Sequence, residues 1–234
     1  MAADQAIVLA GGLGTRLRSV VADLPKALAP VAGRPFLAWL LDALEAGGVR
    51  HVVLATGYMA AAVERFAGPR WGAMAVDYSR EDQPLGTGGA VRLAAGRLAP
   101  GEGVHVVNGD TFLRYAPQAL QAATEAAGAD AGVALARVDD VSRYGSVAIA
   151  GDRIEAFREK QGTGGGFINA GCYYLTPRAI AALPDRENFS LERDVLEPMA
   201  RSGALAAFTR TSGFIDIGVP EDFHRAQALF GAAP

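Results

Sequence analysis

A short apolar run followed by closely spaced glycines constrains this chain more than any other feature. Residues 7–10 are apolar, which predicts a buried strand of a parallel sheet. Three glycines fall within the next four positions, so the chain turns tightly and leaves its backbone amides open to a ligand. Amides that point into such a concavity attract anions, most often phosphates. Arg16 and Lys26 add positive charge, so the stretch predicts a phosphate-binding loop.

Three kinds of phosphate loop compete for this stretch. The dinucleotide fingerprint G-x-G-x-x-G is incomplete, because Leu17 stands where its third glycine belongs. The nucleoside triphosphatase loop G-x-x-x-x-G-K-[ST] lacks its Gly-Lys pair. The third pattern, G-G-x-G-T-R-L with a later Pro-Lys pair, is complete at residues 11–17 and 25–26. It is the signature of sugar-1-phosphate nucleotidyltransferases, and the stretch resembles that family. A plain glycine turn with surface charges is the remaining alternative.

Composition limits the classes of protein to which this chain can belong. Its 234 residues suffice for one sizeable α/β domain, and 50% of them are hydrophobic, as in a protein with a well-filled core. A net charge of −3 gives no long-range attraction for nucleic acid or an anionic membrane, so we expect neither as a partner. Cys172 is the only cysteine, which excludes an intrachain disulfide and a cysteine-rich zinc site. With no signal-like or membrane-spanning segment in the sequence, we expect a cytoplasmic protein.

Hydrophobic periodicity predicts alternating strands and helices, which favours right-handed crossovers and a mainly parallel sheet. The second half differs, because residues 146–149 and 153–157 flank a Gly-Asp pair as the arms of a hairpin do. We therefore expect a single domain, 1–234, with a nucleotide-binding lobe at about 1–138 and a sugar-binding lobe at about 139–234. Strands are expected at 7–10, 51–55, 74–78, 103–107, 132–138, 146–149, 153–157, 171–175 and 214–217, and helices at 35–46, 59–67, 90–98, 117–127, 177–183, 191–201 and 220–230.

A second glycine-rich run, residues 81–90, precedes the helix expected at 90–98. Taken alone, it is typical of a turn in which Thr87 caps the helix. Beside the first loop, its flat backbone and small side chains could admit a nucleobase, with Gln83 or main-chain groups reading the base edge. The run resembles the second nucleotide-binding segment of the same family, L-G-T-G/A-x-A.

Two aspartates stand where apolar strands end or are interrupted. Asp110 closes a polar triplet after the strand 103–107, and ligands of open parallel sheets bind at the carboxyl ends of strands. A turn-capping aspartate is the alternative. Asp216 stands between two isoleucines, where a carboxylate is costly to bury unless it is paired or bound to metal. Both resemble the ligands of the family's catalytic Mg²⁺. His105 lies inside the first strand, and we expect it in the core.

Motifs in the second half resemble the sugar side of the family. They are Tyr144-Gly145, Glu159-Lys160 and the Asn-x-Gly pattern of residues 169–171. By this likeness a glycine lies under the sugar ring, Lys160 grips the sugar phosphate, and Glu159 and Asn169 bind hydroxyl groups. From its residue type alone, Lys160 is equally a solvated surface lysine.

The resemblance runs from Ile7 to Phe230 with the motifs in family order. It implies a Rossmann-like α/β/α sandwich with a mixed, mainly parallel sheet, the fold of nucleotide-diphospho-sugar transferases. It also implies Mg²⁺ as cofactor, and a nucleoside triphosphate and a sugar 1-phosphate as substrates. The implied site comprises catalytic Arg16 and Lys26; nucleotide-binding Leu9, Ala10, Gly11, Gly12, Gly14, Thr15, Gln83, Gly86, Thr87, Gly88 and Asn108; sugar-phosphate-binding Gly145, Glu159, Lys160, Asn169 and Gly171; and metal-binding Asp110 and Asp216.

Within the family, residues 18–26 and 83–90 and the short length look most like enzymes that join GTP to D-glycero-α-D-manno-heptose 1-phosphate for surface glycans. Mannose 1-phosphate with GTP, and N-acetylmuramate 1-phosphate with UTP, are the alternatives; Gly86 disfavours the latter, which carries an acidic residue there. A non-catalytic nucleotide-sugar sensor is disfavoured because the charged site residues are retained. An NAD-dependent oxidoreductase is disfavoured by Leu17. The sequence implies no oligomeric state.

Overall fold

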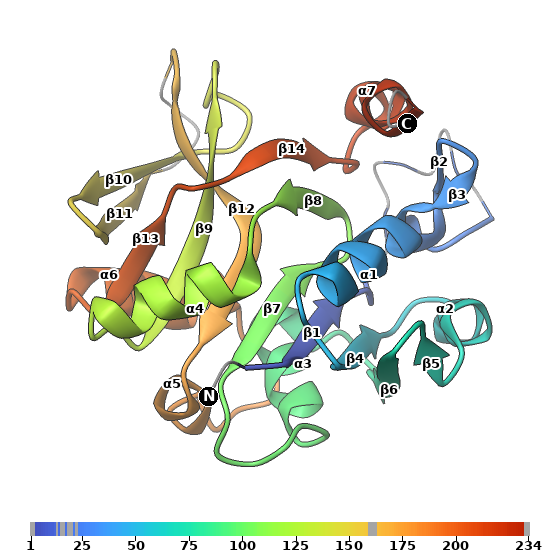
Figure 1. Cartoon of the computed structure of the whole chain (residues 1–234), viewed down its shortest axis with the longest axis horizontal. Helices are drawn as coiled ribbons and strands as arrows, with labels where there is room; N and C mark the ends of the chain where they lie inside the picture. Colours follow the sequence, from blue (N-terminus) through green and yellow to red (C-terminus); the bar gives the residue numbers. More distant parts are fainter. Residues whose placement is uncertain are drawn as a thin grey trace.

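One large sheet runs through the molecule in the computed structural model, which describes residues 3–12, 14, 17, 21, 23–158 and 163–231. Ten strands of the described residues form this sheet (Figure 1). Their spatial order is β10 (Ser146–Ala150), β11 (Arg153–Arg158), β13 (Leu205–Phe208), β9 (Ala131–Val138), β12 (Gly166–Leu175), β7 (Val104–Asn108), β1 (Gln5–Leu9), β4 (His51–Thr56), β6 (Met74–Arg80) and β5 (Arg70–Trp71).

The centre of the sheet is parallel and its flanks are mixed. The strands β6, β4, β1 and β7 pair in parallel, as does β9 with β13. Strand β12 lies antiparallel between β7 and β9, while β5 and the hairpin β10–β11 add antiparallel edges. The predicted mixed, mainly parallel sheet is therefore confirmed, since β5, β11 and β12 run against the direction shared by the other strands.

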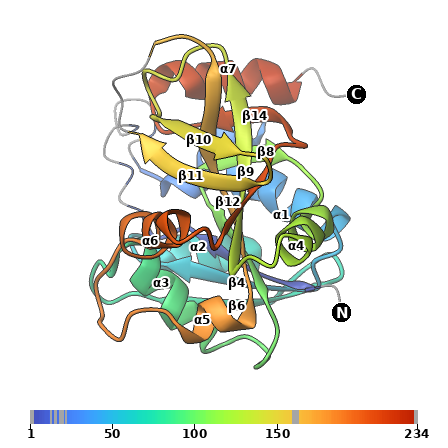
Figure 2. The same ribbon diagram turned by 90° about the vertical axis from the view of Figure 1, so that its left-hand side faces the viewer.

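Helices cover both faces of the sheet, which gives the predicted three-layer sandwich. Figure 2 shows α1 and α4 on one side of the strands and α3, α5 and α6 on the other. The two faces have separate hydrophobic cores. The first is covered by α1 (Phe36–Ala46), α2 (Ala60–Ala67), α4 (Pro117–Ala126) and α7 (Pro220–Gly231). The second is covered by α3 (Gly86–Ala95), α5 (Pro177–Ala181), the π-helical turn η3 (Glu192–Leu196) and α6 (Glu197–Arg201).

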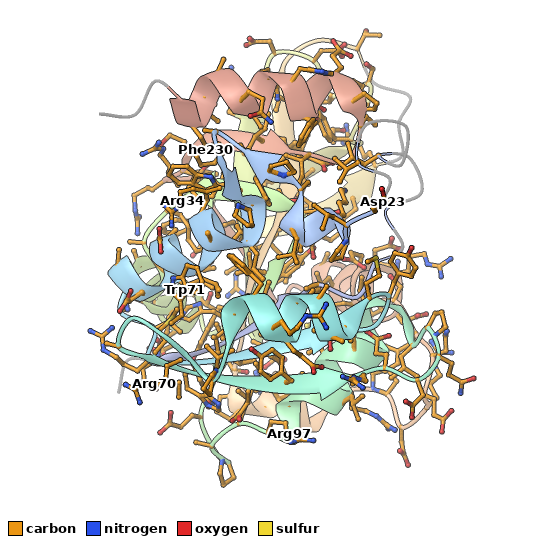
Figure 3. All side chains as sticks on the ribbon, turned by 90° about the vertical axis from the view of Figure 1, so that its right-hand side faces the viewer. Asp23, Arg34, Arg70, Trp71, Arg97 and Phe230 are labelled. Carbon is orange, nitrogen blue, oxygen red and sulfur yellow. The ribbon has the colours of Figure 1, made fainter. Side chains whose placement is uncertain are left out.

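The first helix shows how the sequence pattern produces this packing. Pro35 precedes α1, whose apolar side chains recur on one face and are buried, and the chain leaves it at Gly47. At one end of the molecule, Phe230 of α7 packs on this layer, with ring centroids 4.8 Å from Trp39 and 6.2 Å from Phe36. Figure 3 shows the side chain of Phe230 just below the ribbon of α7, with Arg34 beneath it.

Two small sheets complete the fold. Strand β2 (Pro30–Val31) pairs with β3 (Arg34–Pro35), and β8 (Thr111–Arg114) pairs with β14 (Ser212–Asp216). A short 3₁₀ helix, η2 (Lys26–Leu28), precedes them. Neither β8 nor β13 is predicted by the sequence, because four residues carry too little periodicity to identify a strand.

The structure corrects two helix predictions. The helix expected at 90–98 begins at Gly86, and its N-cap is Leu85 rather than Thr87. Its glycines are required by close packing, since a Cβ on Gly88 would lie 2.2 Å from the Phe189 ring. The helix expected at 191–201 begins as η3 and becomes α-helical from Glu197. The division into two lobes stays a prediction.

Candidate functional site

A pocket of about 610 Å³ opens at the carboxyl edge of the parallel strands. It is formed by residues that end or directly follow four neighbouring strands (β7, β1, β4 and β6) and by the first turn of α3. Ligands of open α/β sheets bind at this edge. The lining residues are Leu9, Gly11, Gly12, Gly57, Tyr58, Glu81, Asp82, Gln83, Pro84, Gly86, Thr87, Ala90, Asn108 and Asp110.

The pocket unites the two glycine-rich stretches that are far apart in the sequence. The residues predicted to bind nucleotide that line it are Leu9, Gly11, Gly12, Gln83, Gly86, Thr87 and Asn108. Three others are described but do not line it. Ala10 is buried, Gly14 lies against the stem of Lys26, and Gly88 is buried against Phe189.

The backbone just after β1 passes close to its neighbours at Gly11. A Cβ on Gly11 would lie 2.9 Å from Glu81 Oε1 and 3.2 Å from the backbone nitrogen of Gly57. Gly12, in contrast, has open space where its Cβ would be. The first glycine is therefore tightly packed, whereas the second leaves the backbone open toward the pocket.

Thr87 connects the second glycine-rich stretch to η3 in the same helical layer. Its hydroxyl donates to Glu192 Oε2 at 2.7 Å and accepts from the Leu191 amide at 2.9 Å. Glu192 also accepts from Tyr173 on β12 at 3.2 Å. These hydrogen bonds to η3 fix the first turn of α3, which forms a wall of the pocket.

Several pocket residues were not predicted as site residues, namely Gly57, Tyr58, Glu81, Asp82, Pro84 and Ala90. A signal for two of them exists in the sequence, because Gly57 and Tyr58 lie two and three residues beyond the predicted strand 51–55 and directly follow β4 as it forms. Residues at that place in a parallel sheet share an edge with the first glycine loop. Glu81 similarly follows β6.

Lys26 and two aspartates form a charged cluster next to this pocket. The Lys26 Nζ lies 2.5 Å from Asp110 Oδ2 and 3.7 Å from Asp216 Oδ1, and its side chain is only 11% exposed. Gly218 closes the cluster, since a Cβ there would lie 3.0 Å from Lys26 Nζ. The Gly218 amide also donates to Asp216 Oδ1 at 2.7 Å.

The two aspartates meet because β8 pairs with β14. Asp110 immediately precedes β8, and Asp216 is opposite Thr111 in the antiparallel register. The Ile217 amide donates to the Asp110 carbonyl at 3.0 Å, which locks the two segments together. A pair of residues 106 positions apart in the numbering therefore shares one site through a strand that the sequence does not reveal.

The donor set of this cluster suits a hard divalent cation. Burial raises the pKa of Asp216, and the neighbouring Asp110 raises it further, while Lys26 opposes both. A second positive charge between the carboxylates would relieve that repulsion. No group of three or more His, Cys, Asp or Glu suited to a metal occurs among the described residues. Two carboxylates completed by substrate phosphates are what Mg²⁺ usually accepts.

Residues predicted on the sugar side adjoin the same edge. A Cβ on Gly171 would lie 2.4 Å from Asn108 Nδ2, so this glycine touches the nucleotide side directly. Asn169 donates to the Tyr173 hydroxyl at 3.1 Å and accepts from the Gly171 amide at 2.9 Å. The Asn169 side-chain amide thereby stabilises the register shift in β12 between Asn169 and Cys172. Its nitrogen retains a second N–H donor, and its oxygen retains a second lone pair.

The turn before Gly145 is anchored to α7. Asp222, which is fully buried, accepts from Arg143 at 2.5 Å and from the Tyr144 hydroxyl at 3.3 Å. Burial raises the pKa of Tyr144, as do the charges of Asp222 and Asp216. Gly145 follows with a φ of +80°, a conformation that favours glycine.

Four predicted site residues, Thr15, Arg16, Glu159 and Lys160, lie outside the described residues. His105, expected in the core, is fully buried. Among the helices of the described residues, none has the length and hydrophobicity needed to cross a bilayer.

Comparison with known proteins gives consistent matches over the whole chain. The nucleotidyl transferase family matches residues 5–231. The D-glycero-alpha-D-manno-heptose 1-phosphate guanylyltransferase of Aneurinibacillus thermoaerophilus is 38% identical, over 95% of this chain and 96% of that protein. The mannose-1-phosphate guanylyltransferase of Mycobacterium tuberculosis is 36% identical, over 98% of this chain and 66% of that protein. The crystal structure of HddC from Yersinia pseudotuberculosis complexed with GMP-PN has a TM-score of 0.83 and 35% identity, and covers 97% of this chain and 100% of that one.

Proposed function

The chain belongs to the nucleotidyl transferase family, and from this we propose that it transfers a guanylyl group from GTP to a sugar 1-phosphate. D-glycero-α-D-manno-heptose 1-phosphate is the favoured acceptor, and the products are the GDP-sugar and pyrophosphate. The name of the Aneurinibacillus relative supports both the base and the sugar. Since such substrates are cytoplasmic metabolites, we place the reaction in the cytoplasm.

One observation carries this proposal. A pocket lined by two glycine-rich stretches shares its edge with Asp110, and Asp110 contacts Lys26 and lies beside Asp216. The pocket has room for a nucleoside, and the charged cluster lies where the phosphates of a nucleotide held there would extend. Asn108 also lines the pocket, and its buried Oδ1 has no hydrogen-bond partner among the described residues.

In the proposed reaction, an oxygen of the sugar phosphate attacks the α-phosphorus of GTP in line with the leaving pyrophosphate. The attacking phosphate is already ionised, so no protein base and no covalent intermediate are needed. The chain's contribution is alignment and charge neutralisation. Lys26 is held beside Asp110 at 2.5 Å and can turn its ammonium group toward a bound phosphate, and we assign Arg16 the same role at the leaving group.

Asp110 and Asp216 would hold the Mg²⁺ ion. When bound, Mg²⁺ supplies charge stabilisation to the phosphates. Burial and, secondly, the charge of Asp110 raise the pKa of Asp216, and a bound cation would relieve both effects. Lys26 balances part of the same negative charge.

We assign the acceptor to the side of the edge formed by Gly145, Asn169 and Gly171, with Glu159 and Lys160 completing it. Two features support this assignment. Gly171 adjoins Asn108 of the nucleotide pocket, and the turn at Gly145 adjoins the aspartate pair through Tyr144, whose pKa responds to Asp216. The nucleotide-binding lobe at about 1–138 and the sugar-binding lobe at about 139–234 remain our assignment.

The experiment is a pyrophosphate-release assay with Mg²⁺, four nucleoside triphosphates and three sugar 1-phosphates. We expect the highest kcat/KM with GTP and the heptose 1-phosphate, and no release when either substrate or the metal is omitted. A preference for mannose 1-phosphate would replace the acceptor and retain the guanylyl donor, as the Mycobacterium relative's name suggests. A preference for UTP with N-acetylmuramate 1-phosphate would replace both. Binding without turnover of any pair would identify a nucleotide-sugar sensor.

A further inference from the structure

One carboxylate behind the nucleotide pocket connects the pocket wall with the sugar side of the site. Glu192 lies in η3, is half-buried, and accepts three hydrogen bonds from side chains. Its Oε2 accepts from the Thr87 hydroxyl at 2.7 Å and from the Ser190 hydroxyl at 2.9 Å. Its Oε1 accepts from the Tyr173 hydroxyl at 3.2 Å. The proposed reaction uses neither Glu192 nor Tyr173.

Glu192 determines the direction of the hydrogen bonds that reach Asn169. Because a carboxylate only accepts hydrogen bonds, the Tyr173 hydroxyl must donate its proton to Glu192. The hydroxyl oxygen is then left to accept, and the Asn169 Nδ2 donates to it at 3.1 Å. Tyr173 is only 1% exposed. Burial, and next the charge of Glu192, raise the pKa of Tyr173 well above its usual value, so the hydroxyl keeps the proton that it donates.

The side-chain amide of Asn169 is therefore held through both its nitrogen and its oxygen. The oxygen accepts from the Gly171 amide at 2.9 Å, where the register of β12 shifts. A flipped amide would place two acceptor oxygens, those of Asn169 and Tyr173, against each other, so the donor and the acceptor keep their places. One N–H and one lone pair remain for a ligand in fixed directions. A sugar hydroxyl both donates and accepts, and it suits such a pair.

The same carboxylate fixes a residue on the nucleotide side. Thr87 lines the pocket in the first turn of α3, and its hydroxyl oxygen accepts from the Leu191 amide at 2.9 Å. The hydroxyl proton is donated to Glu192, so the side chain is held from both directions. The Gly88 amide donates to the Phe189 carbonyl at 2.9 Å and holds the backbone of this turn on the same segment. Glu192 thus contacts the nucleotide side directly and the sugar side through one tyrosine.

We propose that Glu192 is a positioning residue for both substrates, which orients Thr87 directly and Asn169 through the Tyr173 hydroxyl. The inference rests on the proposed transfer, with Asn169 on its sugar side, and adds the group that holds the two sides relative to each other. Glu192 and Tyr173 are both described, and neither lines the pocket, so they act through other residues. In-line attack requires both substrates in a fixed mutual orientation, which this arrangement supplies.

The test is steady-state kinetics with GTP and D-glycero-α-D-manno-heptose 1-phosphate. Tyr173→Phe removes only the hydroxyl, so the KM for the sugar 1-phosphate should rise about five- to tenfold while the KM for GTP stays unchanged. Thr87→Val should show the reverse pattern, and Thr87→Ser, which keeps the hydroxyl, should behave as wild type. Ser190 still holds Glu192 in each of these variants. Glu192→Gln changes the common partner and should raise both KM values about five- to tenfold.

Matched controls exist on the same elements. Tyr174→Phe removes the hydroxyl of the next residue of β12, which is equally buried but faces the other core and contacts Glu125 at 3.5 Å. Glu197→Gln makes the same chemical change as Glu192→Gln on a surface side chain, which pairs with Arg201 at 3.8 Å. Both controls should leave both KM values unchanged.

An unchanged KM for the sugar 1-phosphate in Tyr173→Phe, or an equal rise of both KM values, would overturn the proposal, because the hydroxyl would then serve packing alone. Calorimetry separates this proposal from the proposed function, since it requires no turnover. The protein is titrated with the α,β-methylene analogue of GTP, and the complex is then titrated with the heptose 1-phosphate. Weaker binding of the sugar 1-phosphate alone by Tyr173→Phe supports the proposal even if no transfer occurs, and equal effects on both ligands reject it.

Discussion

At the scale of single residues, the proposed transfer depends on one lysine held by two carboxylates. Lys26 is almost enclosed, and its ammonium contacts Asp110 while lying near Asp216. We expect Lys26→Ala to lower kcat by about 100-fold or more, since the lost charge stabilises the transition state rather than the bound substrate. Steady-state kinetics checks this. An unchanged kcat with a raised KM would show that Lys26 serves binding alone.

The carboxylates themselves are tested by removing charge while keeping shape. Asp110→Asn and Asp216→Asn should each fold normally and lose about 100-fold or more in turnover, because charge stabilisation by a metal is worth several kcal/mol. Raising the Mg²⁺ concentration should restore only part of the activity. The measurement is kcat as a function of Mg²⁺, with circular dichroism as the folding control. Near-wild-type turnover of either variant at low Mg²⁺ would make that aspartate structural.

At the scale of elements, the glycines of α3 are fixed by their packing on residues 187–191. A Cβ on Gly88 would lie 2.2 Å from the Phe189 ring and 3.0 Å from the Leu191 nitrogen. We expect Gly88→Ala to destabilise the protein by about 1–3 kcal/mol, as overpacking does. Gly96→Ala at the C-cap of the same helix is the control, because its Cβ would make only an ordinary contact at 3.5 Å. Urea unfolding of both variants measures the difference, and equal stabilities would contradict this account of α3.

Element by element, the sequence predicts the long periodic segments well and the short ones poorly. The stripe of α1 and the apolar run of β4 carry clear periodic signals, and both elements form as expected. Strand β8 carries no such signal, yet its pairing with β14 brings Asp216 to Asp110. The second glycine run, residues 81–90, is predicted to be a loop; residues 81–85 are non-helical, whereas residues 86–90 begin α3 because the glycines allow a close tertiary contact. Pairings and contacts between distant segments are not encoded in any local window.

At the scale of the whole molecule, the central sheet contains a buried histidine that makes stability depend on pH. His105 lies in β7 at the middle of the sheet and is fully buried, with its ring 5.2 Å from that of Tyr174. Burial lowers the pKa of His105 to about 4. The folded state therefore binds fewer protons than the unfolded state, in which a histidine has a pKa of about 6.5.

It follows that stability is fully present above about pH 6.5 and falls as the pH drops toward 4, by up to about 1.4 kcal/mol per pH unit. The variant His105→Leu cannot titrate at this position. It should therefore reduce the slope of the unfolding free energy against pH by an amount that corresponds to at most one bound proton. Denaturant unfolding between pH 4.5 and 7.5 measures the two slopes. Parallel slopes for wild type and variant would show that His105 does not cause the loss of stability in acid.

The whole-molecule arrangement also explains how much of the site could be predicted. The two glycine stretches, Asn108 and Asp110 each follow or end a predicted strand, and the rule that ligands bind at the carboxyl edge of a parallel sheet unites them. Gly57 and Glu81 obey the same rule but carry no familiar motif, so they were missed. The opposition of Glu81 to Gly11 depends on the order of β6, β4 and β1 in the sheet, which a sequence does not state.

The most direct test of the central claim is to identify the product. Wild-type protein is incubated with GTP, Mg²⁺ and D-glycero-α-D-manno-heptose 1-phosphate, and the nucleotides are analysed by mass spectrometry. The account predicts GDP-heptose and pyrophosphate in equal amounts from wild type, with about 100-fold slower formation by Asp216→Asn. If wild type forms no nucleotide sugar from any triphosphate and sugar 1-phosphate while remaining folded, the account is contradicted.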